Sequence, residues 1–524
     1  MYFSIFVDTI VFYFIFQLYS VTTLMDYIIG VDIGTSGTKA VAFGIGGEVV
    51  AEYRIGYGIL NPQPGYFEQE PDTLYMAVIQ SIAGVGQAVA HTAPGNRVLG
   101  VGFSSAMHGL IAVDEQNAPL TNCIIWADTR SEMFATQLKA TAAGLDIYLK
   151  TGTPIHPMSP LCKLGWMREH LPATFSHAHK FISIKEYVFF KLFGRYVVDE
   201  SIASATGLFD STAFDWYAPA LALVGISKAQ LSTLVPVTHT LTGLDKQAAK
   251  VMGIPEDTPF VVGGSDGCLA NLGAHAIAPG DAAVTIGTSG AIRMASSLPK
   301  TDSQARTFSY VLTKDLFVLG GAVNNGGVVL SWYNDNFGVA GTTIEDAYQQ
   351  LAEEAASVPA GAEGLIFLPY LAGERAPHWD ANAKGLFFGV QMHHRKAHFT
   401  RAVFEGIVYG MYSVGKVLEE ISGPVHVIHA NGGFARSPMW VQLLADVFNK
   451  QVLVKESVES AAKGAFMVAL KALNRITDFR DVLEDTVTAR YLPDLDNHQR
   501  YQENFRLFER LYGRVKDEFY HSPN

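Results

Sequence analysis

The sequence contains few cysteines and no block of basic residues. Its 524 residues include 3 cysteines, Cys123, Cys162 and Cys268, and no CxxC pair. So sparse a cysteine content is typical of a reducing compartment and predicts a cytoplasmic protein without a disulfide framework. The formal net charge is −12, and no Lys/Arg run provides the basic face that nucleic-acid binding requires. We therefore expect small-molecule partners and no nucleic acid.

Long hydrophobic runs are also scarce, apart from one at the N-terminus. Residues 1–24 are apolar and aromatic, as in a membrane anchor or a signal peptide. However, Asp8 and Gln17 interrupt this stretch, and it lacks a Lys/Arg flank and a small-residue cleavage site. We therefore interpret Met25 as the effective start and residues 1–25 as an extension outside the fold. A membrane anchor is the less favoured alternative.

The chain is too long for a single hydrophobic core, and its pattern divides into two halves. The pentapeptide IGTSG occurs twice, at residues 33–37 and 286–290, each time between two apolar runs that indicate a strand hairpin. Strands alternate with helical patterns, which predicts layered α/β domains. We predict two related domains with a cleft between them and a C-terminal helical tail, over residues 26–270, 271–475 and 476–524.

The repeated turn favours phosphate binding. Gly, Thr and Ser expose backbone N–H groups and hydroxyls with little side-chain bulk, which suits phosphate oxygens. One such turn is usually structural. Two copies, each heading one half of the chain, predict a nucleotide triphosphate held between two domains.

Two acidic residues accompany these turns. Asp32 precedes the first turn where Thr285 precedes the second. A carboxylate beside a phosphate needs a cation between them, so Asp32 is a candidate Mg²⁺ ligand. Asp266 ends an apolar strand and begins a helix, where it can cap the helix or act as a catalytic base that accepts a proton from an attacking hydroxyl. Lys39, at the far end of the first hairpin, either reaches a phosphate or is a solvated strand end.

Two further motifs resemble known functional sites but lack residues that those sites require. Residues 410–416 imitate Walker A spacing, but Val417 follows where Ser or Thr is needed, and the segment has the apolar period of a core helix. His393, His394 and His398 lack the accompanying zincin pattern, so we assign no metal to them.

Three long stretches resemble the FGGY family of carbohydrate kinases. MSPLCKLGWMREH (158–170) and GLFFGVQMHHRKAHFTRAVFE (385–405) resemble the family's signature patterns, and GGFARSPMWVQLLAD (432–446) resembles its adenine-side loop and helix. The resemblance covers residues 26–475. It implies a two-domain, actin-like ATPase (ribonuclease H-like) α/β fold, with ATP and Mg²⁺ as cofactors.

The resemblance also implies roles for individual residues. Asp32 would hold Mg²⁺ and Asp266 would be the base. On the nucleotide side it implies Thr35, Ser36, Lys39, Gly287, Thr288, Gly327, Ser331, Gly433 and Ser437. On the sugar side it implies Met107, His108, Trp126, Asp128 and Arg130. For Met107 and Trp126, plain core packing is the open alternative.

Within the family, FSSAMHGLIAVDE, IIWADTRS and TGTPIHPMSPLCKL resemble the gluconate kinase subgroup. This predicts ATP-dependent phosphorylation of D-gluconate to 6-phospho-D-gluconate. A xylulokinase is the near alternative, and a non-catalytic sugar sensor is the alternative from another class. A sugar acid needs a cationic partner for its carboxylate, and Arg130, Lys163 and His156 are the candidates. The oligomeric state stays open, with a homodimer among the alternatives.

Overall fold

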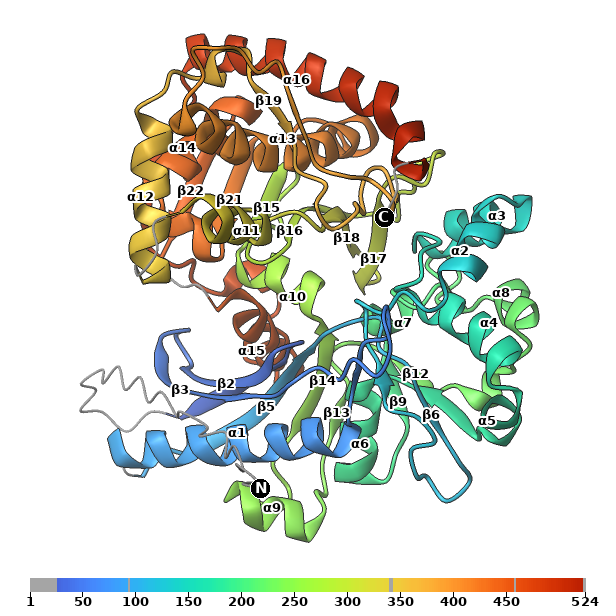
Figure 1. Cartoon of the computed structure of the whole chain (residues 1–524). Helices are drawn as coiled ribbons and strands as arrows, with labels where there is room; N and C mark the ends of the chain where they lie inside the picture. Colours follow the sequence, from blue (N-terminus) through green and yellow to red (C-terminus); the bar gives the residue numbers. More distant parts are fainter. Residues whose placement is uncertain (1–25, 93–94, 339–342, 457–458, 522–524) are drawn as a thin grey trace, which may run out of the picture.

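The computed structural model describes residues 26–92, 95–338, 343–456 and 459–521. The interpretation of residues 1–25 as an extension lies outside these described residues. In Figure 1, two lobes lie one above the other, each built around a β-sheet, and a group of short helices extends from the lower lobe. Helices α10 (Asp266–Gly273) and α15 (Ser460–Ala472) lie between the lobes.

The lower lobe contains a six-stranded sheet in the order β13-β14-β5-β1-β2-β3. Its strands are β1 (Tyr27–Ile33), β2 (Gly37–Gly44), β3 (Val49–Gly56), β5 (Val98–Ser105), β13 (Thr240–Leu241) and β14 (Phe260–Ser265). β1 pairs antiparallel with β2 and parallel with β5, and β14 runs parallel to β5. All of β14, and β1 apart from Asp32, is buried, which explains why both strands read as continuous apolar runs.

The upper lobe contains a seven-stranded sheet in the order β17-β18-β16-β15-β21-β22-β23. Its strands are β15 (Asp281–Ile286), β16 (Gly290–Ser296), β17 (Phe308–Thr313), β18 (Leu316–Val323), β21 (Val427–Asn431), β22 (Gln451–Lys455) and β23 (Val487–Tyr491). Six of them repeat the pairing of the lower sheet, with β15, β16, β18, β21, β22 and β23 in the places of β1, β2, β3, β5, β14 and β13. The two IGTSG turns therefore occupy the same topological position, and the predicted α/β fold of two related halves is confirmed.

Helices cover the outer faces of both sheets. Those of the lower lobe are α1 (Pro71–Thr92), α6 (Ile184–Phe193) and α9 (Lys246–Met252). Those of the upper lobe are α11 (Gly327–Phe337), α12 (Ile344–Ala356), α13 (Lys396–Ser422), α14 (Pro438–Phe448) and α16 (Leu495–Val515). Residues 410–416 lie inside α13, mostly buried, which confirms the prediction of a core helix. Among the described residues, α1 alone has the length and apolar composition of a membrane span, and it packs against β2, β3 and α9.

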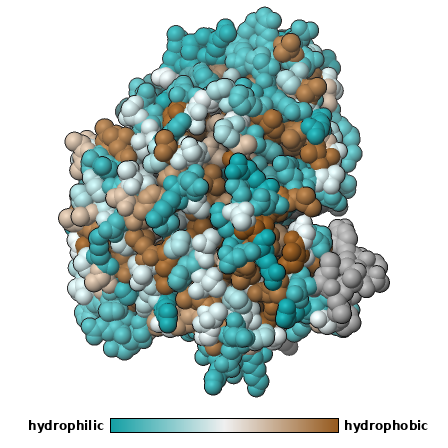
Figure 2. Space-filling view, turned by 180° about the vertical axis from the view of Figure 1, so that it is seen from behind, coloured by the Kyte–Doolittle hydropathy of each residue, from teal (hydrophilic) through white to brown (hydrophobic). Residues whose placement is uncertain are grey.

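The remaining elements form the extension beside the lower lobe and short strand pairs. The helices are α2 (Glu132–Lys139), α3 (Ala142–Thr151), α4 (Pro160–His170), α5 (Pro172–His177), α7 (Glu200–Ser204) and α8 (Ala218–Val224). The strands are β4 (Glu68–Gln69), β6 (Ile111–Val113), β7 (Cys123–Ile124), β8 (Lys180–Ile182), β9 (Val197–Asp199), β10 (Phe209–Asp210), β11 (Asp215–Trp216), β12 (Thr233–Val235), β19 (Ile366–Leu368) and β20 (Leu386–Phe388). Seen from behind, hydrophilic residues cover much of the upper lobe, with apolar residues interspersed over the rest of that face (Figure 2).

Helix α15 belongs to the second half of the sequence but packs on the sheet of the first half, against β5, β1 and β14. Glycines make this approach possible. A Cβ on Gly30 would lie 2.2 Å from the Ala462 carbonyl oxygen, and one on Gly102 would lie 2.3 Å from that of Ala465. Both distances are far below van der Waals contact, so the strands need glycine at these two positions.

Candidate active site

The two predicted acidic residues lie together at the carboxyl ends of parallel strands. Asp32 on β1 is directly opposite Ser104 on β5, and Ser104 is opposite Gly264 on β14, two residues before Asp266. The Ser104 hydroxyl donates a hydrogen bond to Asp32 Oδ1 at 2.7 Å. This is the sheet edge at which α/β folds bind ligands.

Burial is the main electrostatic influence on the carboxyl groups of this edge, and neighbouring charges come second. Burial raises the pKa of Asp32 to about 6, with further contributions from Asp266 and Glu459. Burial also raises the pKa of Asp266, against the opposing effect of Arg293 and Lys185. Glu459 is the residue immediately before α15. The sequence does not predict it, because its place beside Asp32 depends on how α15 packs on the sheet.

Asp266 is the first residue of α10, and Ser265 occupies the cap position before it. The carboxylate of Asp266 accepts a hydrogen bond from the Gly267 backbone N–H at 2.7 Å. The helix-cap interpretation therefore describes only part of its surroundings. The carboxylate also interacts electrostatically with Asp32 and with the guanidinium of Arg293.

The first IGTSG turn is held by side chains of the lower lobe. Trp126 Nε1 donates to the Thr35 hydroxyl at 2.9 Å, and Arg54 Nη2 donates to the exposed Ser36 hydroxyl at 3.2 Å. Lys39 forms ion pairs with Glu52 at 3.3 Å and with Glu459 at 2.8 Å. It is therefore a paired residue that ties β2 to the start of α15.

The second IGTSG turn lies against the start of α11. The Gly327 N–H donates to the Gly287 carbonyl at 2.6 Å, and the Val328 N–H donates to the Thr288 carbonyl at 3.0 Å. A Cβ on Gly327 would lie 2.7 Å from the Gly287 oxygen, so this approach requires glycine. Gly287 and Thr288 are themselves exposed. The Gly287 N–H is used within the turn, where it donates to the Ser289 carbonyl at 2.9 Å. An exposed turn beside a helix N-terminus is a suitable site for an anion.

Of the other predicted nucleotide-side residues, Gly433 and Ser331 lie on segments that contact the second turn. Gly432, just before Gly433, has a φ of +91°, and a Cβ there would lie 2.9 Å from the Ile286 carbonyl oxygen. Ser331 lies one turn into α11, and its hydroxyl is 2.6 Å from the Tyr348 hydroxyl. Ser437 is the residue before α14.

On the sugar side, His108 has a left-handed backbone with φ 70°. Its Nδ1 donates to the Ala205 carbonyl at 2.8 Å, and its Nε2 lies 3.4 Å from the Tyr310 hydroxyl. Burial lowers the pKa of His108 to about 3, so the ring is neutral at pH 7. The neighbouring Met107 reaches the start of α10, where its Cε would lie 2.9 Å from a Cβ on Gly267.

Asp128 and Arg130 bind each other. Arg130 donates through Nη2 to Asp128 Oδ2 at 2.8 Å and to Glu68 Oε1 at 2.6 Å, and its guanidinium lies 3.9 Å over the ring of Tyr66. Asp128 also accepts from the Phe67 N–H at 2.7 Å. These contacts hold the segment that carries Trp126, and the charge of Arg130 is balanced by two carboxylates.

The other two candidate partners for a substrate carboxylate are Lys163 and His156. The first is fully hydrogen-bonded and the second is uncharged. Lys163 is fully buried, and its Nζ donates to the carbonyls of His108, Ile124 and Ile125 at 2.6, 3.0 and 2.9 Å. These bonds use all three of its N–H groups. Burial, followed by the charge of Arg375, lowers the pKa of His156 well below its ordinary value, so its ring carries no charge at pH 7.

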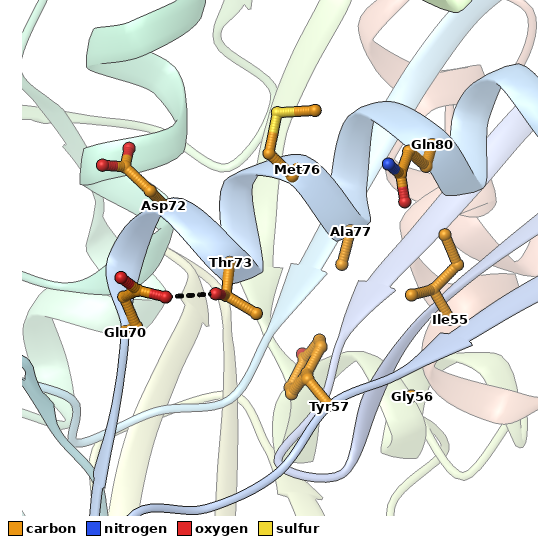
Figure 3. Close-up of a pocket in the computed structure, with 9 residues that line it drawn as sticks. All are labelled: Ile55, Gly56, Tyr57, Glu70, Asp72, Thr73, Met76, Ala77 and Gln80. Carbon is orange, nitrogen blue, oxygen red and sulfur yellow. Dashed lines mark hydrogen bonds between the residues drawn. The ribbon is translucent and has the colours of Figure 1, made fainter. Parts of the chain in front are cut away.

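A separate groove of about 340 Å³ lies between the end of β3 and α1 (Figure 3). Tyr57 lines it and donates from its hydroxyl to the Gly34 carbonyl at 2.6 Å, behind the first turn. None of the predicted site residues lines this groove. Among the described residues, no group of three or more His, Cys, Asp and Glu side chains has the arrangement of a metal site. A cation at Asp32 would therefore need ligands from a bound molecule or water.

The duplicated sheet, the paired turns and the acidic edge define a two-domain protein of the actin-like ATPase fold. The model of the N-terminal domain of the FGGY family of carbohydrate kinases matches residues 27–273, and the model of its C-terminal domain matches residues 282–473. The chain belongs to the FGGY family of carbohydrate kinases, as the resemblance predicted.

Individual relatives agree with this assignment. The chain is 45% identical over 506 residues to a gluconokinase from Bacillus licheniformis, covering 95% of this chain and 97% of the relative. It is 30% identical over 504 residues to a xylulose kinase from Bacillus subtilis (strain 168), covering 94% and 98%. The crystal structure of a gluconate kinase from Lactobacillus acidophilus superposes with a TM-score of 0.90 at 35% identity, covering 94% of this chain and 98% of that one.

Proposed function

We propose that this enzyme transfers the γ-phosphoryl group of ATP to D-gluconate, giving 6-phospho-D-gluconate. The observation that carries the proposal is the 45% identity to a gluconokinase along almost the whole of both chains. The xylulose kinase matches over a similar length at 30%. Substrate choice within a shared fold depends on site residues, so the higher identity favours the sugar acid over the ketose.

Asp266 is the proposed catalytic base. The oxygen of the terminal hydroxyl attacks the γ-phosphorus, its proton passes to the Asp266 carboxylate, and the bond from the γ-phosphorus to the bridging oxygen breaks to release ADP. Burial raises the pKa of Asp266, which makes its carboxylate a stronger proton acceptor than an exposed one. Its place at the end of β14 lets a sugar between the domains reach it.

Asp32 is the proposed anchor for Mg²⁺. Burial, followed by the charges of Asp266 and Glu459, raises the pKa of its carboxyl group, and hard oxygen ligands with excess negative charge fit a divalent cation. Mg²⁺ bound there would neutralise charge on the transferring phosphoryl group. Ser104 fixes Asp32 by donating to Oδ1, which leaves the second carboxylate oxygen to face the nucleotide.

The two IGTSG turns are the proposed phosphate clamps. Thr35 and Ser36 would offer their N–H groups and hydroxyls from the lower lobe, and Thr288 would offer its N–H group and hydroxyl from the upper lobe. Gly287 would leave room for the phosphate, because the space beside it is open. Gly327 at the start of α11 adds a helix N-terminus, which favours negative charge. Gly433, on the segment that packs against β15, and Ser437, at the start of α14, would border the adenosine.

A coupled ADP-release assay with Mg-ATP tests this function. The panel is D-gluconate, D-xylulose, glycerol, D-ribulose and a no-sugar control, with protein starting at Met25. Turnover highest on D-gluconate is expected. Turnover highest on D-xylulose would refute the substrate but keep the kinase, and ATP binding without sugar-dependent turnover would refute the enzyme.

A further inference from the structure

Two arginines of the upper lobe lie on the sugar side without a carboxylate partner. Arg293 is on β16, and Arg375 follows β19. Neither takes part in any ion pair between described residues. The Nε of Arg293 is buried and has no hydrogen-bond partner in the part of the chain that the structure describes. The carboxylates of Asp266 and Glu374 act electrostatically on Arg293 and Arg375, but neither forms an ion pair with its arginine. Each guanidinium therefore keeps N–H donors that can bind an anion.

Arg293 lies at the start of α10, on the sugar side of Asp266. Its Nε would lie 3.2 Å from a Cβ on Gly267, the same point that Met107 Cε approaches to 2.9 Å. The absence of a side chain at Gly267 therefore provides the space into which the guanidinium extends. Because Met107 belongs to the predicted sugar-side turn, Arg293 borders the substrate.

Arg375 is held in place by neutral groups. Its Nε donates to Asn324 Oδ1 at 2.7 Å and its Nη2 donates to the Val323 carbonyl at 3.2 Å, while its guanidinium lies 4.9 Å over the ring of Trp126. The neighbouring Glu374 uses Oε1 for the backbone N–H groups of Asn324 and Arg375, at 2.6 and 2.8 Å. The orientation of the Arg375 guanidinium is therefore fixed, and the Glu374 carboxylate favours its charge without forming an ion pair with it.

The two guanidinium groups act on each other. Burial lowers the pKa of Arg375 to about 10, and the charge of Arg293 contributes to that lowering. Tyr310, whose hydroxyl lies 3.4 Å from His108 Nε2, interacts with both arginines. Two buried cations that repel each other beside the sugar-side turn form a preorganised receptor for one anion.

We propose that Arg293 and Arg375 together bind the carboxylate of the sugar acid. This assignment rests on the proposed function, and it replaces Arg130, Lys163 and His156, which are paired, fully bonded or neutral. Arginine suits the role because its planar fork matches a carboxylate with two hydrogen bonds. Since both arginines belong to the upper lobe and Asp266 to the lower, the bound acid would link the two domains.

Arg293→Gln is the most informative variant. The Nε of Arg293 has no hydrogen-bond partner among the described residues, so its replacement breaks no hydrogen bond at that atom. It does remove a charge that acts on Asp266. Losing one partner of a buried charge pair should raise the KM for D-gluconate about 100-fold. The KM for Mg-ATP and competition by D-glucitol, which carries an alcohol in place of the carboxylate, should stay close to wild type. The pKa of the base in the kcat–pH profile should rise, because the charge of Arg293 lowers the pKa of Asp266. The control is Arg490→Gln, an exposed arginine on β23, which should change nothing.

Arg375→Lys is the second variant, because it keeps the charge but loses the fork, and it should raise the same KM by a smaller factor. An unchanged KM for D-gluconate in Arg293→Gln would overturn the proposal. So would a lower kcat at unchanged KM, because that result would assign Arg293 to the transferring phosphoryl group. If the wild-type enzyme does not phosphorylate D-gluconate at all, the proposed function fails first and removes the basis of this assignment.

Discussion

The indole N–H of Trp126 donates to the hydroxyl of Thr35 at 2.9 Å, which joins the sugar-side segment to the first IGTSG turn. The guanidinium of Arg375, from the upper lobe, lies over a face of the same indole, 4.9 Å from the ring centroid. Trp126 therefore contacts a turn assigned to phosphate and an arginine assigned to the sugar acid. One side chain therefore connects the proposed phosphate site with the proposed carboxylate site.

Trp126→Phe tests this link. The ring under Arg375 is kept and the N–H donor is lost, so we expect kcat/KM for D-gluconate to fall about tenfold, the equivalent of one hydrogen bond. The double variant Thr35→Val/Trp126→Phe should cost little more than either single change. Fully additive losses would show that the two residues act independently.

Asp32 gives a pH-dependent prediction. Its pKa is raised from 3.8 to about 6 in the folded chain, so protons compete with Mg²⁺ as the pH falls through that value. We expect the Mg²⁺ concentration for half-maximal turnover to rise below about pH 6. Asp32→Asn should need far more Mg²⁺ at every pH. A wild-type Mg²⁺ requirement that is flat between pH 5 and 8 would remove Asp32 as the anchor.

The same shift predicts how stability changes with pH. A carboxyl group whose pKa is higher in the folded than in the unfolded chain destabilises the fold when it ionises. The free energy of unfolding therefore falls as the pH rises from 3.8 to about 6, and the loss is complete above that value. Nucleotide-free Asp32→Asn should therefore have a higher Tm than the wild type at pH 7, and the gain should disappear near pH 4. A lower Tm at pH 7 would contradict the assigned sign.

Lys163 is predicted to be structural. Lys163→Met keeps most of the apolar volume but leaves the carbonyls of His108, Ile124 and Ile125 without their donor. We expect a loss of about 3 kcal/mol or more in the free energy of unfolding, measured by denaturant titration. Lys191→Met, at a half-exposed ion pair with Asp72, is the matched control and should cost under about 1 kcal/mol. Similar losses in both variants would refute the role of Lys163.

The glycine contact under α15 is testable in the same way. Gly102→Ala would place a Cβ 2.3 Å from the Ala465 carbonyl oxygen, and we expect it to destabilise the fold by about 2 kcal/mol or more because the helix must shift. Gly86→Ala on α1, where a Cβ meets nothing within 4 Å, should be neutral or stabilising by up to about 1 kcal/mol. Equal stability of the two variants would show that α15 adapts without cost.

Much of the fold could be predicted from the sequence because local pattern carries it. The buried strands β1 and β14 read as apolar runs, and the repeated turn marked the two related halves. Asp32 and Asp266 could be identified because each stands at the polar end of such a run. These signals are local, so they can be recognised without knowledge of the tertiary structure.

The arginines of the sugar side could not be identified in this way. Whether a cation is free depends on its partners, and the sequence does not show that Arg130 meets Glu68 or that Lys163 meets three carbonyls. The one available signal was Arg293 itself, a charged residue inside the apolar run that follows the second turn. Glu459 and α15 were hidden for a related reason, because a helix near residue 460 packs on strands that lie more than 300 residues earlier.

The measurement that tests the account most directly is gluconate-dependent ADP release by the wild-type enzyme and by Asp266→Asn, with Mg-ATP binding measured on the same samples. We predict turnover on D-gluconate by the wild type, a fall in kcat of about 10²–10⁴-fold in the variant, and unchanged nucleotide binding. Near-normal turnover by Asp266→Asn would contradict the assigned base, and a wild-type enzyme inactive on D-gluconate would contradict the proposed function itself.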